Sequence, residues 1–373
     1  MRHSDKEEIN RYGEHIAISV TNSCPLQCKH CISGSAPDTA RADSGLVDSF
    51  ADFLDKWPRI NHVTFTGGEP FHNPNELTRF ADACKQRNIR YGVITGAFWA
   101  KSIKSCDNYL KAVPDLITMT VSTDLYHQQF VTHQHVMNAV HAARKRAVHI
   151  KVRFTHANPM SEAEEEIHAR LKKDLTVKEL EYAPLQKYGR AEAEGIGRQY
   201  DRWKNSGQTR FGLCPSTGPH IFENGRVTPC CNTIVSLRND DHPLVFGNLL
   251  QDGAKAVYQA QAENTLWIAI KVLGFDWLHE QLVELKPSYI DYGPINACDF
   301  CYDACREGSI HEDIMALMAD PNVALYIHSI MAFIHNGKES AALLPRLARY
   351  AKAERASSAV DRGVDTRIEI KAL

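Results

Sequence analysis

The sequence predicts an α/β fold built around a parallel sheet, and three observations support it. Short runs rich in β-branched residues recur along residues 13–190, longer amphipathic stretches separate them, and cysteines and glycines cluster after the first two runs. Strands that alternate with helices are typical of a parallel sheet with helix-covered faces. Ligands of such sheets bind at the carboxyl ends of the strands, so the chemistry is expected in the loops that follow them.

The elements can be placed in order along this part of the chain. Six runs are expected to be buried strands: 15–20, 62–66, 91–95, 116–122, 149–155 and 177–182. Helical patterns occupy the intervals at 46–57, 76–86, 102–112, 134–146 and 162–171. In the first of these the apolar residues fall on one face, as the helical period requires.

The remainder of the chain divides into three parts. Residues 191–210 are polar and contain glycines, so a linker is expected there. Residues 211–305 carry a second group of cysteines, and a long helical insert is expected around 254–284. Residues 306–373 have the pattern of a helical extension.

Composition and charge exclude several classes of protein. The 373 residues are 43% hydrophobic and 24% charged, enough for two or three packed units. A formal net charge of -2 provides no basic surface for nucleic acid. No stretch reaches the roughly 18 apolar residues of a membrane span, and the charged start of the chain lacks the features of a secretory signal. We therefore expect a cytoplasmic protein with no nucleic-acid or membrane partner.

The chain contains eleven cysteines, which in a reducing compartment are better explained as metal ligands or catalytic thiols than as disulfides. Cys24, Cys28 and Cys31 lie in the loop after the first predicted strand. A zinc site would need a fourth ligand, and His30 is the neighbouring candidate. Three thiolates also suit three corners of a [4Fe-4S] cube, with one iron left for a non-protein ligand.

This loop resembles the radical SAM signature, and residues 13–190 resemble the partial (β/α)6 barrel of that superfamily. The resemblance implies that Cys24, Cys28 and Cys31 ligate a [4Fe-4S] cluster and that S-adenosylmethionine binds its free iron. It also implies reductive cleavage to a 5'-deoxyadenosyl radical and a reducing partner of flavodoxin or ferredoxin type. His30 occupies a position that is usually aromatic in the family.

A second motif follows the second predicted strand. The stretch "FTGGEP" stands where the superfamily carries its Gly-Gly-Glu-Pro motif, beside the amino group of S-adenosylmethionine. Glycine lets the backbone approach a ligand closely, and a carboxylate can pair with an ammonium group. The resemblance implies that the cofactor is contacted by Gly67, Gly68, Glu69 and Pro70.

Later strand ends supply further candidate contacts by the same resemblance. Thr95 begins the stretch that corresponds to Thr-Asn-Gly in the family. Ser122 and Asp124 stand where groups that contact the ribose are common, and Arg153 stands where a basic residue often pairs with the cofactor's carboxylate. Leu185 lies in "PLQKYGRA", which resembles the stretch that passes the adenine. Taken singly, each is equally well explained as a satisfied group at a barrel mouth.

The second group of cysteines is similar to the pattern of the Twitch and SPASM auxiliary-cluster domains. Gly225 is expected in a two-residue hairpin turn that would bring two cysteines to adjacent strand ends. The resemblance implies one auxiliary [4Fe-4S] cluster in a Twitch-like domain, and a zinc ribbon is the alternative. The candidate ligands are Cys214, Cys230, Cys298, Cys301 and Cys305.

The substrate is less well determined than the chemistry. An auxiliary cluster that accepts an electron favours oxidative modification of a peptide or protein, a cross-link or a dehydrogenation, by a radical SAM oxidoreductase of the peptide-maturase kind. The alternative is a dehydrogenase or epimerase of a small sugar or aminocyclitol, in which Cys231 or Cys305 could return a hydrogen atom. Tyr126 and His127 follow the fourth predicted strand and could touch the substrate, although packing is the plainer interpretation.

Overall fold

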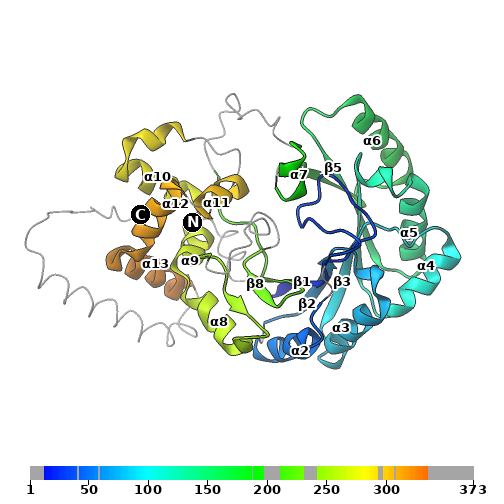
Figure 1. Cartoon of the computed structure of the whole chain (residues 1–373), viewed down its shortest axis with the longest axis horizontal. Coiled ribbons are helices and arrows are strands. Elements are labelled where there is room, and N and C mark those ends of the chain that lie inside the picture. The colour runs from blue at the N-terminus through cyan, green and yellow to red at the C-terminus, as the bar shows by residue number, and fades with distance from the viewer. Residues whose placement is uncertain are drawn as a thin grey trace, which may run out of the picture.

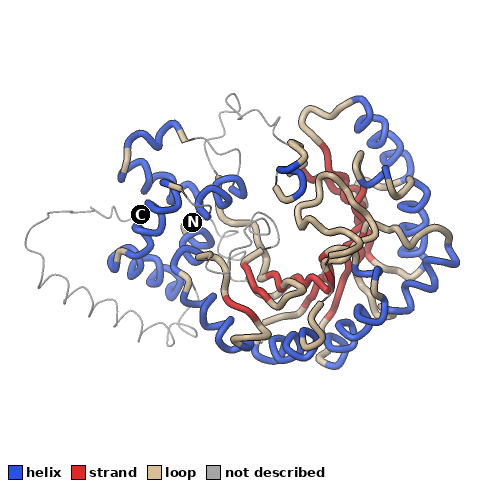
Figure 2. Tube along the Cα trace, viewed as in Figure 1, coloured by secondary structure: helices blue, strands red, loops and turns tan. Residues whose placement is uncertain are grey.

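The computed structural model describes most of the chain, and its helices and strands are drawn in Figure 2. The described residues are 12–39, 42–57, 59–186, 188–196, 211–230, 242–292, 297–305 and 308–334. The linker expected at 191–210 lies within this description only as far as residue 196, and Cys231 lies outside it.

Six parallel strands form the larger part of one curved sheet, in the spatial order in which they occur along the chain. They are β1 (His15–Thr21), β2 (His62–Gly67), β3 (Arg90–Thr95), β4 (Thr118–Thr123), β5 (His149–His156) and β6 (Leu180–Pro184). Five helices follow the outer, convex side of the sheet (Figure 1). They are α2 (Leu46–Lys56), α3 (Pro74–Gln86), α4 (Ile103–Tyr109), α5 (His133–Lys145) and α6 (Glu162–Asp174).

This arrangement confirms the predicted partial barrel, and the largest difference among the strand starts is that of the sixth strand. The sixth strand begins at Leu180, three residues later than expected, because residues 176–179 form a turn. The Glu179 N–H donates to the carbonyl of Thr176 at 3.0 Å, and the Glu179 carboxylate accepts the Thr176 N–H at 2.8 Å. These contacts form a turn ahead of the strand, and the Glu179 carbonyl reaches β5, where it accepts the Val152 N–H at 2.7 Å.

Alternation along the strands separates the core from the concave side of the sheet. In β4, Met119 and Val121 are fully buried beneath the helices, whereas Thr120 and Ser122 are half-buried. Side chains alternate between the two faces of a strand, so the half-buried set points into the curve of the barrel. The polar residues at the strand ends therefore share one concave surface.

The cysteine-rich region continues the same sheet. Strand β7 (His220–Ile221) pairs with β1 in parallel, and β8 (Arg226–Thr228) and β9 (Gly247–Asn248) follow in antiparallel pairing. The hairpin between β7 and β8 is not the expected two-residue turn. Phe222 N–H bonds to the Arg226 carbonyl, which leaves three residues in the loop, with Gly225 at φ +84°. A left-handed residue in third position is typical of such three-residue loops.

Helices make up most of the rest of the described chain. The expected linker begins inside a short helix, α7 (Arg190–Ala193), and the insert is three helices instead of one: α8 (Gly253–Glu263), α9 (Thr265–Val272) and α10 (Gly274–Leu285). Asn264 starts α9 by accepting the Trp267 N–H at 2.8 Å, and Gly274, at φ +84°, starts α10. Both residues break the helical run because they favour helix ends over helix interiors.

The expected C-terminal helical extension is confirmed as far as residue 334. It follows α11 (Ala297–Cys305) and consists of α12 (Ser309–Ala319) and α13 (Pro321–Ile334), which lie with α9 and α10 at the opposite end of the molecule from α4 to α6 (Figure 1). Among the described helices none is long and apolar enough by itself to cross a membrane. Among the described residues, α12 and the first part of α13 together are long and apolar enough for a span, but the two helices are bent by 74° relative to each other.

Candidate active site

The first three cysteines lie in a loop that leaves the end of β1 and folds back on itself. The Cys24 N–H donates to the Ala36 carbonyl at 3.0 Å, and the Cys31 N–H donates to the Cys28 carbonyl at 3.1 Å. Cys24 is 8% exposed and Cys28 is 6% exposed, and all three cysteines are free of disulfides. The loop therefore presents three thiols in a largely buried setting at the carboxyl edge of the sheet.

The environment of these thiols disfavours bare thiolates. Burial raises the pKa of Cys24 to about 12, and the neighbouring Glu69 carboxylate adds to the effect. Burial also raises the pKa of Cys28, with Asp124 as the next cause. Arg190 opposes both shifts because its positive charge favours the thiolate form. Buried thiols of this kind become thiolates when a metal replaces their protons.

The spacing of the sulfurs favours a cluster over a zinc ion. Three thiolates around one tetrahedral zinc, at Zn–S of about 2.3 Å, lie about 3.8 Å apart. Within the described residues, the set of three or more ligand atoms that all lie within 4.8 Å of one another is His30, Asp124 and His127, and it contains no cysteine. The three sulfurs do not all lie within 4.8 Å of one another, as ligands of one zinc ion would, and three thiols are the donor set of three corners of a [4Fe-4S] cube.

The two glycines at the end of β2 are required by a close approach to β1 and the loop that follows it. Gly67 has φ +118°, and a Cβ added there would lie 2.1 Å from the carbonyl oxygen of Thr21. A Cβ on Gly68 would lie 2.3 Å from the carbonyl oxygen of Ser23. Pro70 then begins a short 3-10 helix, Pro70–His72. Glycine at these positions brings the Gly-Gly-Glu-Pro segment directly against the start of the cysteine loop.

Glu69 is held at the centre of this edge by neighbouring strands. Its carboxylate is 1% exposed and accepts the Thr95 hydroxyl at 2.8 Å, the Gly96 N–H at 2.8 Å and the Phe71 N–H at 3.1 Å. Burial raises the pKa of Glu69 to about 7, although these hydrogen bonds oppose the shift. The structure thus joins Glu69 and Thr95, two separately predicted contacts, in one unit.

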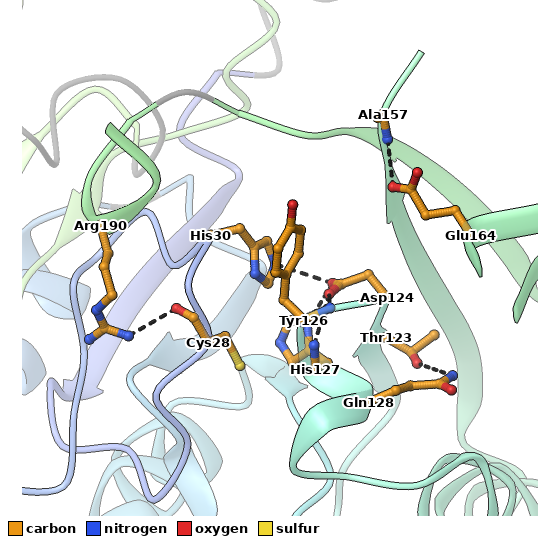
Figure 3. Close-up of polar contacts among 10 residues, drawn as sticks. All are labelled: Cys28, His30, Thr123, Asp124, Tyr126, His127, Gln128, Ala157, Glu164 and Arg190. Atoms are coloured by element: carbon orange, nitrogen blue, oxygen red, sulfur yellow. Dashed lines mark hydrogen bonds and ion pairs between the residues drawn. The ribbon is translucent and has the colours of Figure 1, made fainter. Parts of the chain in front are cut away.

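A second polar unit faces the cysteine loop from the end of β4. The Asp124 carboxylate is 1% exposed and lies 3.1 Å from Nε2 of His30 and 2.5 Å from Nδ1 of His127 (Figure 3). Its other oxygen accepts the N–H groups of Tyr126 and His127 at 2.8 and 2.9 Å. Although burial raises the pKa of Asp124, the two imidazoles outweigh burial and leave it well below its usual range.

Tyr126 completes this unit by stacking on His30. The ring centroids are 4.9 Å apart and the planes differ by 23°. His30 belongs to the cysteine loop and Tyr126 follows β4, so the stack joins two of the strand ends. The three ligand atoms of His30, Asp124 and His127 are close enough to hold a metal ion, yet their hydrogen bonds to one another already satisfy the buried carboxylate.

Residues 18–180 match the family model described as "Radical SAM superfamily". The chain carries a radical SAM domain. It is also similar to "Putative peptide biosynthesis protein YydG" of Bacillus subtilis (strain 168), with 22% identity over 301 residues, 78% of this chain and 91% of that protein. A solved structure, "Native anSMEcpe with bound AdoMet and Cp18Cys peptide", shares the fold at a TM-score of 0.50 and 14% identity, covering 85% of this chain and 99% of that one.

The remaining predicted contacts of the radical SAM domain lie on β4, on β5 and just after β6. Ser122 and Arg153 are register partners, and Arg153 is in turn the partner of Glu181. The Arg153 guanidinium bonds to the Glu181 carboxylate at 2.8 Å, and both side chains are partly exposed on the concave side. Leu185 is buried, and its N–H donates to the His156 carbonyl at 2.9 Å. Glu181 was not foreseen as the partner of Arg153.

The second set of cysteines comes from three separate segments. Cys214 precedes β7, Cys230 follows β8, and Cys298, Cys301 and Cys305 lie on α11. Burial raises the pKa of Cys214 to about 12, and the proximity of Cys301 and Cys298 adds to the shift. Cys214, in the segment before β7, therefore lies close to the cysteines of α11.

Two residues support this second set and were not foreseen. Lys271, 1% exposed, donates from Nζ to the carbonyls of Cys214 at 3.0 Å and Ser216 at 2.8 Å. His242 Nε2 lies 2.6 Å from the carbonyl oxygen of Cys305. A lysine within the apolar run of α9 was a visible signal for Lys271, because lysine is buried only when its ammonium group is paired. His242 carried no comparable signal.

Proposed function

We propose that this radical SAM enzyme oxidises a peptide or protein substrate, giving a cross-link or a dehydrogenated residue. Its resident group would be a [4Fe-4S] cluster on Cys24, Cys28 and Cys31 with S-adenosylmethionine bound. When bound and reduced, this pair supplies a 5'-deoxyadenosyl radical that takes a hydrogen atom from the substrate. The observation that carries the proposal is the group of three disulfide-free thiols, two buried and one partly buried, directly against the Gly-Gly-Glu-Pro segment.

The chain's own residues bind and orient the reactants. Glu69, fixed by Thr95 and Gly96, offers a buried carboxylate for the amino group of S-adenosylmethionine. Arg153 and Ser122 lie side by side on the concave face and can receive the carboxylate and ribose. Asp124 holds the imidazoles of His30 and His127 in fixed orientations beside the loop. Buried groups held in this way need little rearrangement to bind a ligand.

The class of substrate follows from the relative that matches most of the chain. The alignment to YydG of Bacillus subtilis covers 91% of that protein, so the similarity extends beyond the radical SAM domain into the cysteine-rich region. YydG is named for peptide biosynthesis, and this favours a peptide over a sugar or aminocyclitol.

The second set of cysteines supports oxidation. We propose that Cys214, Cys230, Cys298 and Cys301 hold an auxiliary [4Fe-4S] cluster, which would accept one electron from the substrate. Cys305 is 3% exposed on the same helix and is a further candidate ligand. A protein of flavodoxin or ferredoxin type would supply the electron that reduces the first cluster. This reducing partner and the enzyme would act together in the cytoplasm.

The proposal is tested with anaerobically reconstituted enzyme and peptides encoded beside its gene. We expect about eight iron and eight sulfide ions per chain, as two cubes require. S-adenosylmethionine should be cleaved to 5'-deoxyadenosine, and the peptide should lose two hydrogen atoms by mass spectrometry. A Cys28→Ala variant should retain about four irons and form no 5'-deoxyadenosine.

The same assay separates oxidation from epimerisation. In D2O an epimerised peptide gains one deuterium and shows no loss of hydrogen in H2O, whereas an oxidised peptide loses two hydrogens in either solvent. Deuterium gain without oxidation would overturn the oxidative part of the proposal. Zinc instead of iron at the first loop would overturn the whole.

A further inference from the structure

Residues 188–192 contact both the first cysteine loop and α11, the helix that carries three cysteines of the second set. They follow β6 and enter α7, at the point where the radical SAM domain gives way to the cysteine-rich region. Only Leu185, just upstream, was predicted to have a role in this stretch. The contacts of the following residues are more extensive than those of Leu185.

Arg190 binds the first cysteine loop through four hydrogen bonds. Its guanidinium donates to the carbonyl oxygens of Cys28 at 2.9 Å, Gly34 at 2.9 Å and Ser35 at 2.5 Å (Figure 3 shows the bond to Cys28). Its own N–H donates to the Cys31 carbonyl at 2.9 Å. These acceptors lie between Cys28, the second cysteine of the loop, and Ser35 near its end. Arg190 therefore holds together the part of the loop that contains Cys28 and Cys31.

The backbone before Arg190 packs equally closely on this loop. Gly189 has φ +67°, and a Cβ added there would lie 2.2 Å from the carbonyl oxygen of Ile32 and 2.8 Å from that of Cys31. No side chain other than hydrogen fits at this position without moving the loop. The contact between this segment and the loop therefore depends on glycine at position 189 as well as on the hydrogen bonds of Arg190.

The other side of the same segment contacts α11. The Tyr188 hydroxyl donates to the Asp299 carboxylate at 3.2 Å, and the Tyr302 hydroxyl donates to the Glu192 carboxylate at 3.4 Å. The rings of Tyr188 and Tyr302 are 4.7 Å apart. Asp299 and Tyr302 each adjoin a cysteine of the second set in the sequence, so these bonds reach the helix that carries those thiols.

We propose that residues 188–192 are a bridge that fixes the two cysteine sets relative to each other, with Arg190 as the positioning residue for the first loop. The identification of the two sets as cluster ligands rests on the proposed function. The planar guanidinium of arginine presents five donors in a fixed fork, which suits three carbonyls at different points of one loop. Lysine offers a single ammonium group at that place and can satisfy fewer of them.

Amide hydrogen exchange on the full-length, reconstituted chain tests the bridge. Arg190→Ala should speed exchange at the Cys24 and Cys31 amides by tenfold or more, because their hydrogen bonds belong to the clamped loop. Arg190→Lys should give a smaller increase. The matched control is Lys29→Ala, in the same loop, which removes only an exposed ion pair to Glu194 at 3.6 Å and should stay within twofold of the wild type.

Tyr188→Phe tests transmission across the bridge. This variant removes the bond to Asp299 and leaves the hydrogen bonds of Arg190 in place. Because the bridge is proposed to couple its two sides, we expect severalfold faster exchange in α11 and also in the first loop. If amide exchange in the first cysteine loop of Arg190→Ala stays within twofold of the wild type, the proposed role of Arg190 in fixing that loop is overturned. Faster exchange confined to α11 in Tyr188→Phe would overturn the coupling.

A spectroscopic readout connects the bridge to the cluster. In the reduced enzyme we expect the shift of EPR g-values on addition of S-adenosylmethionine to be lost in Arg190→Ala, partly restored in Arg190→Lys and unchanged in Lys29→Ala. An unchanged shift in Arg190→Ala would count against the positioning role. If the chain holds no iron, the proposed function fails, while the exchange measurements still decide whether the bridge exists.

Discussion

Glu69 shows how a single buried carboxylate can serve both the fold and a ligand. Its hydrogen bonds to Thr95, Gly96 and Phe71 fasten the end of β2 to the end of β3. A carboxylate has about four lone-pair sites, so capacity remains for the ammonium group of a cofactor. The same residue would therefore align two strand ends and bind S-adenosylmethionine.

Glu69→Gln should weaken the binding of S-adenosylmethionine by on the order of 10- to 100-fold. A hydrogen bond to a charged group contributes about 1.5–3 kcal/mol, and the amide lacks the charge that attracts an ammonium group. The measurement is equilibrium dialysis of S-adenosylmethionine against anaerobically reconstituted enzyme. The amide NH2 of glutamine is a hydrogen-bond donor and would face donors that now bond to the carboxylate, so a loss of stability is expected as well.

Glu164→Gln is the matched control for that variant. Glu164 is also a buried carboxylate, but it forms the capping box of α6 with Ser161 and bonds to the Ala157 N–H at 2.9 Å (Figure 3). This variant should lower stability and leave cofactor affinity within twofold of the wild type. If Glu69→Gln also binds within twofold, the role of Glu69 is confined to joining the strands.

The sequence could predict which polar residues lie at the carboxyl edge of the sheet but not how they pair. Spacing and resemblance were enough to select Glu69, Thr95 and Asp124, because each lies at or just after the end of a strand and strand ends meet at one edge. The ion pairing of Asp124 with His30 could not be predicted, since it depends on how the cysteine loop folds back. Arg190 was missed for a similar reason: its acceptor on Cys28 lies 162 residues away in the sequence.

At the scale of elements, the end of helix α5 shows a known C-terminal motif with an unfavourable residue in it. Helix α5 ends in a Schellman motif, in which the Ala147 N–H bonds to the Arg144 carbonyl and the Val148 N–H bonds to the Ala143 carbonyl. Ala147 has φ +55° and is exposed. An alanine in the left-handed region is strained by about 1 kcal/mol. Glycine would remove this strain.

Ala147→Gly is expected to raise the free energy of unfolding by about 1 kcal/mol. Asn88 occupies the same place in the matching motif after α3, at φ +55°, and asparagine tolerates that conformation better than alanine. Asn88→Gly should therefore gain only a few tenths of a kcal/mol. Urea unfolding at constant slope measures both variants, and equal gains would contradict the explanation by strain.

Predicting the elements succeeded where their signals are local. The first five strands begin within two residues of the predicted positions because β-branched runs and turn residues mark their limits. The β6 boundary and the division of the insert into three helices depended on hydrogen bonds of Glu179 and Asn264, which compete with the apolar pattern. The periodicity of apolar residues does not predict where such hydrogen bonds end a strand or a helix.

At the scale of the molecule, the sheet unites parts that the sequence presents as separate. The pairing of β7 with β1 joins residues about 200 positions apart, with Ala17 opposite His220. Side-chain contacts strengthen this junction, since Ser19 Oγ lies 2.8 Å from Nε2 of His220. No local pattern identifies β7 as the neighbour of β1, because a two-residue strand has too little sequence to specify a partner.

Two buried histidines, His220 and His328, and the half-buried His62 make the stability of the whole molecule sensitive to acid. Burial lowers the pKa of His220 to about 3, and lowers the pKa of His62 and of His328 to about 4. Positive charge at Arg226 adds to the shift of His220, and His15 and Arg90 add to that of His62. These three residues lie on β7, α13 and β2, so protonating them opposes folding in several regions at once.

We therefore expect the melting temperature to fall as the pH is lowered from 7 to 5. An unfolded histidine binds its proton near pH 6.5, whereas the folded chain resists protonation until about pH 3 or 4, so the unfolded state gains protons over this interval. His220→Gln removes one such group and can keep a hydrogen bond to Ser19. Its stability should depend less steeply on pH, by up to about 1.4 kcal/mol per pH unit. Scanning calorimetry of both proteins from pH 5 to pH 8 measures the difference, and parallel curves would show that His220 takes up no proton on unfolding.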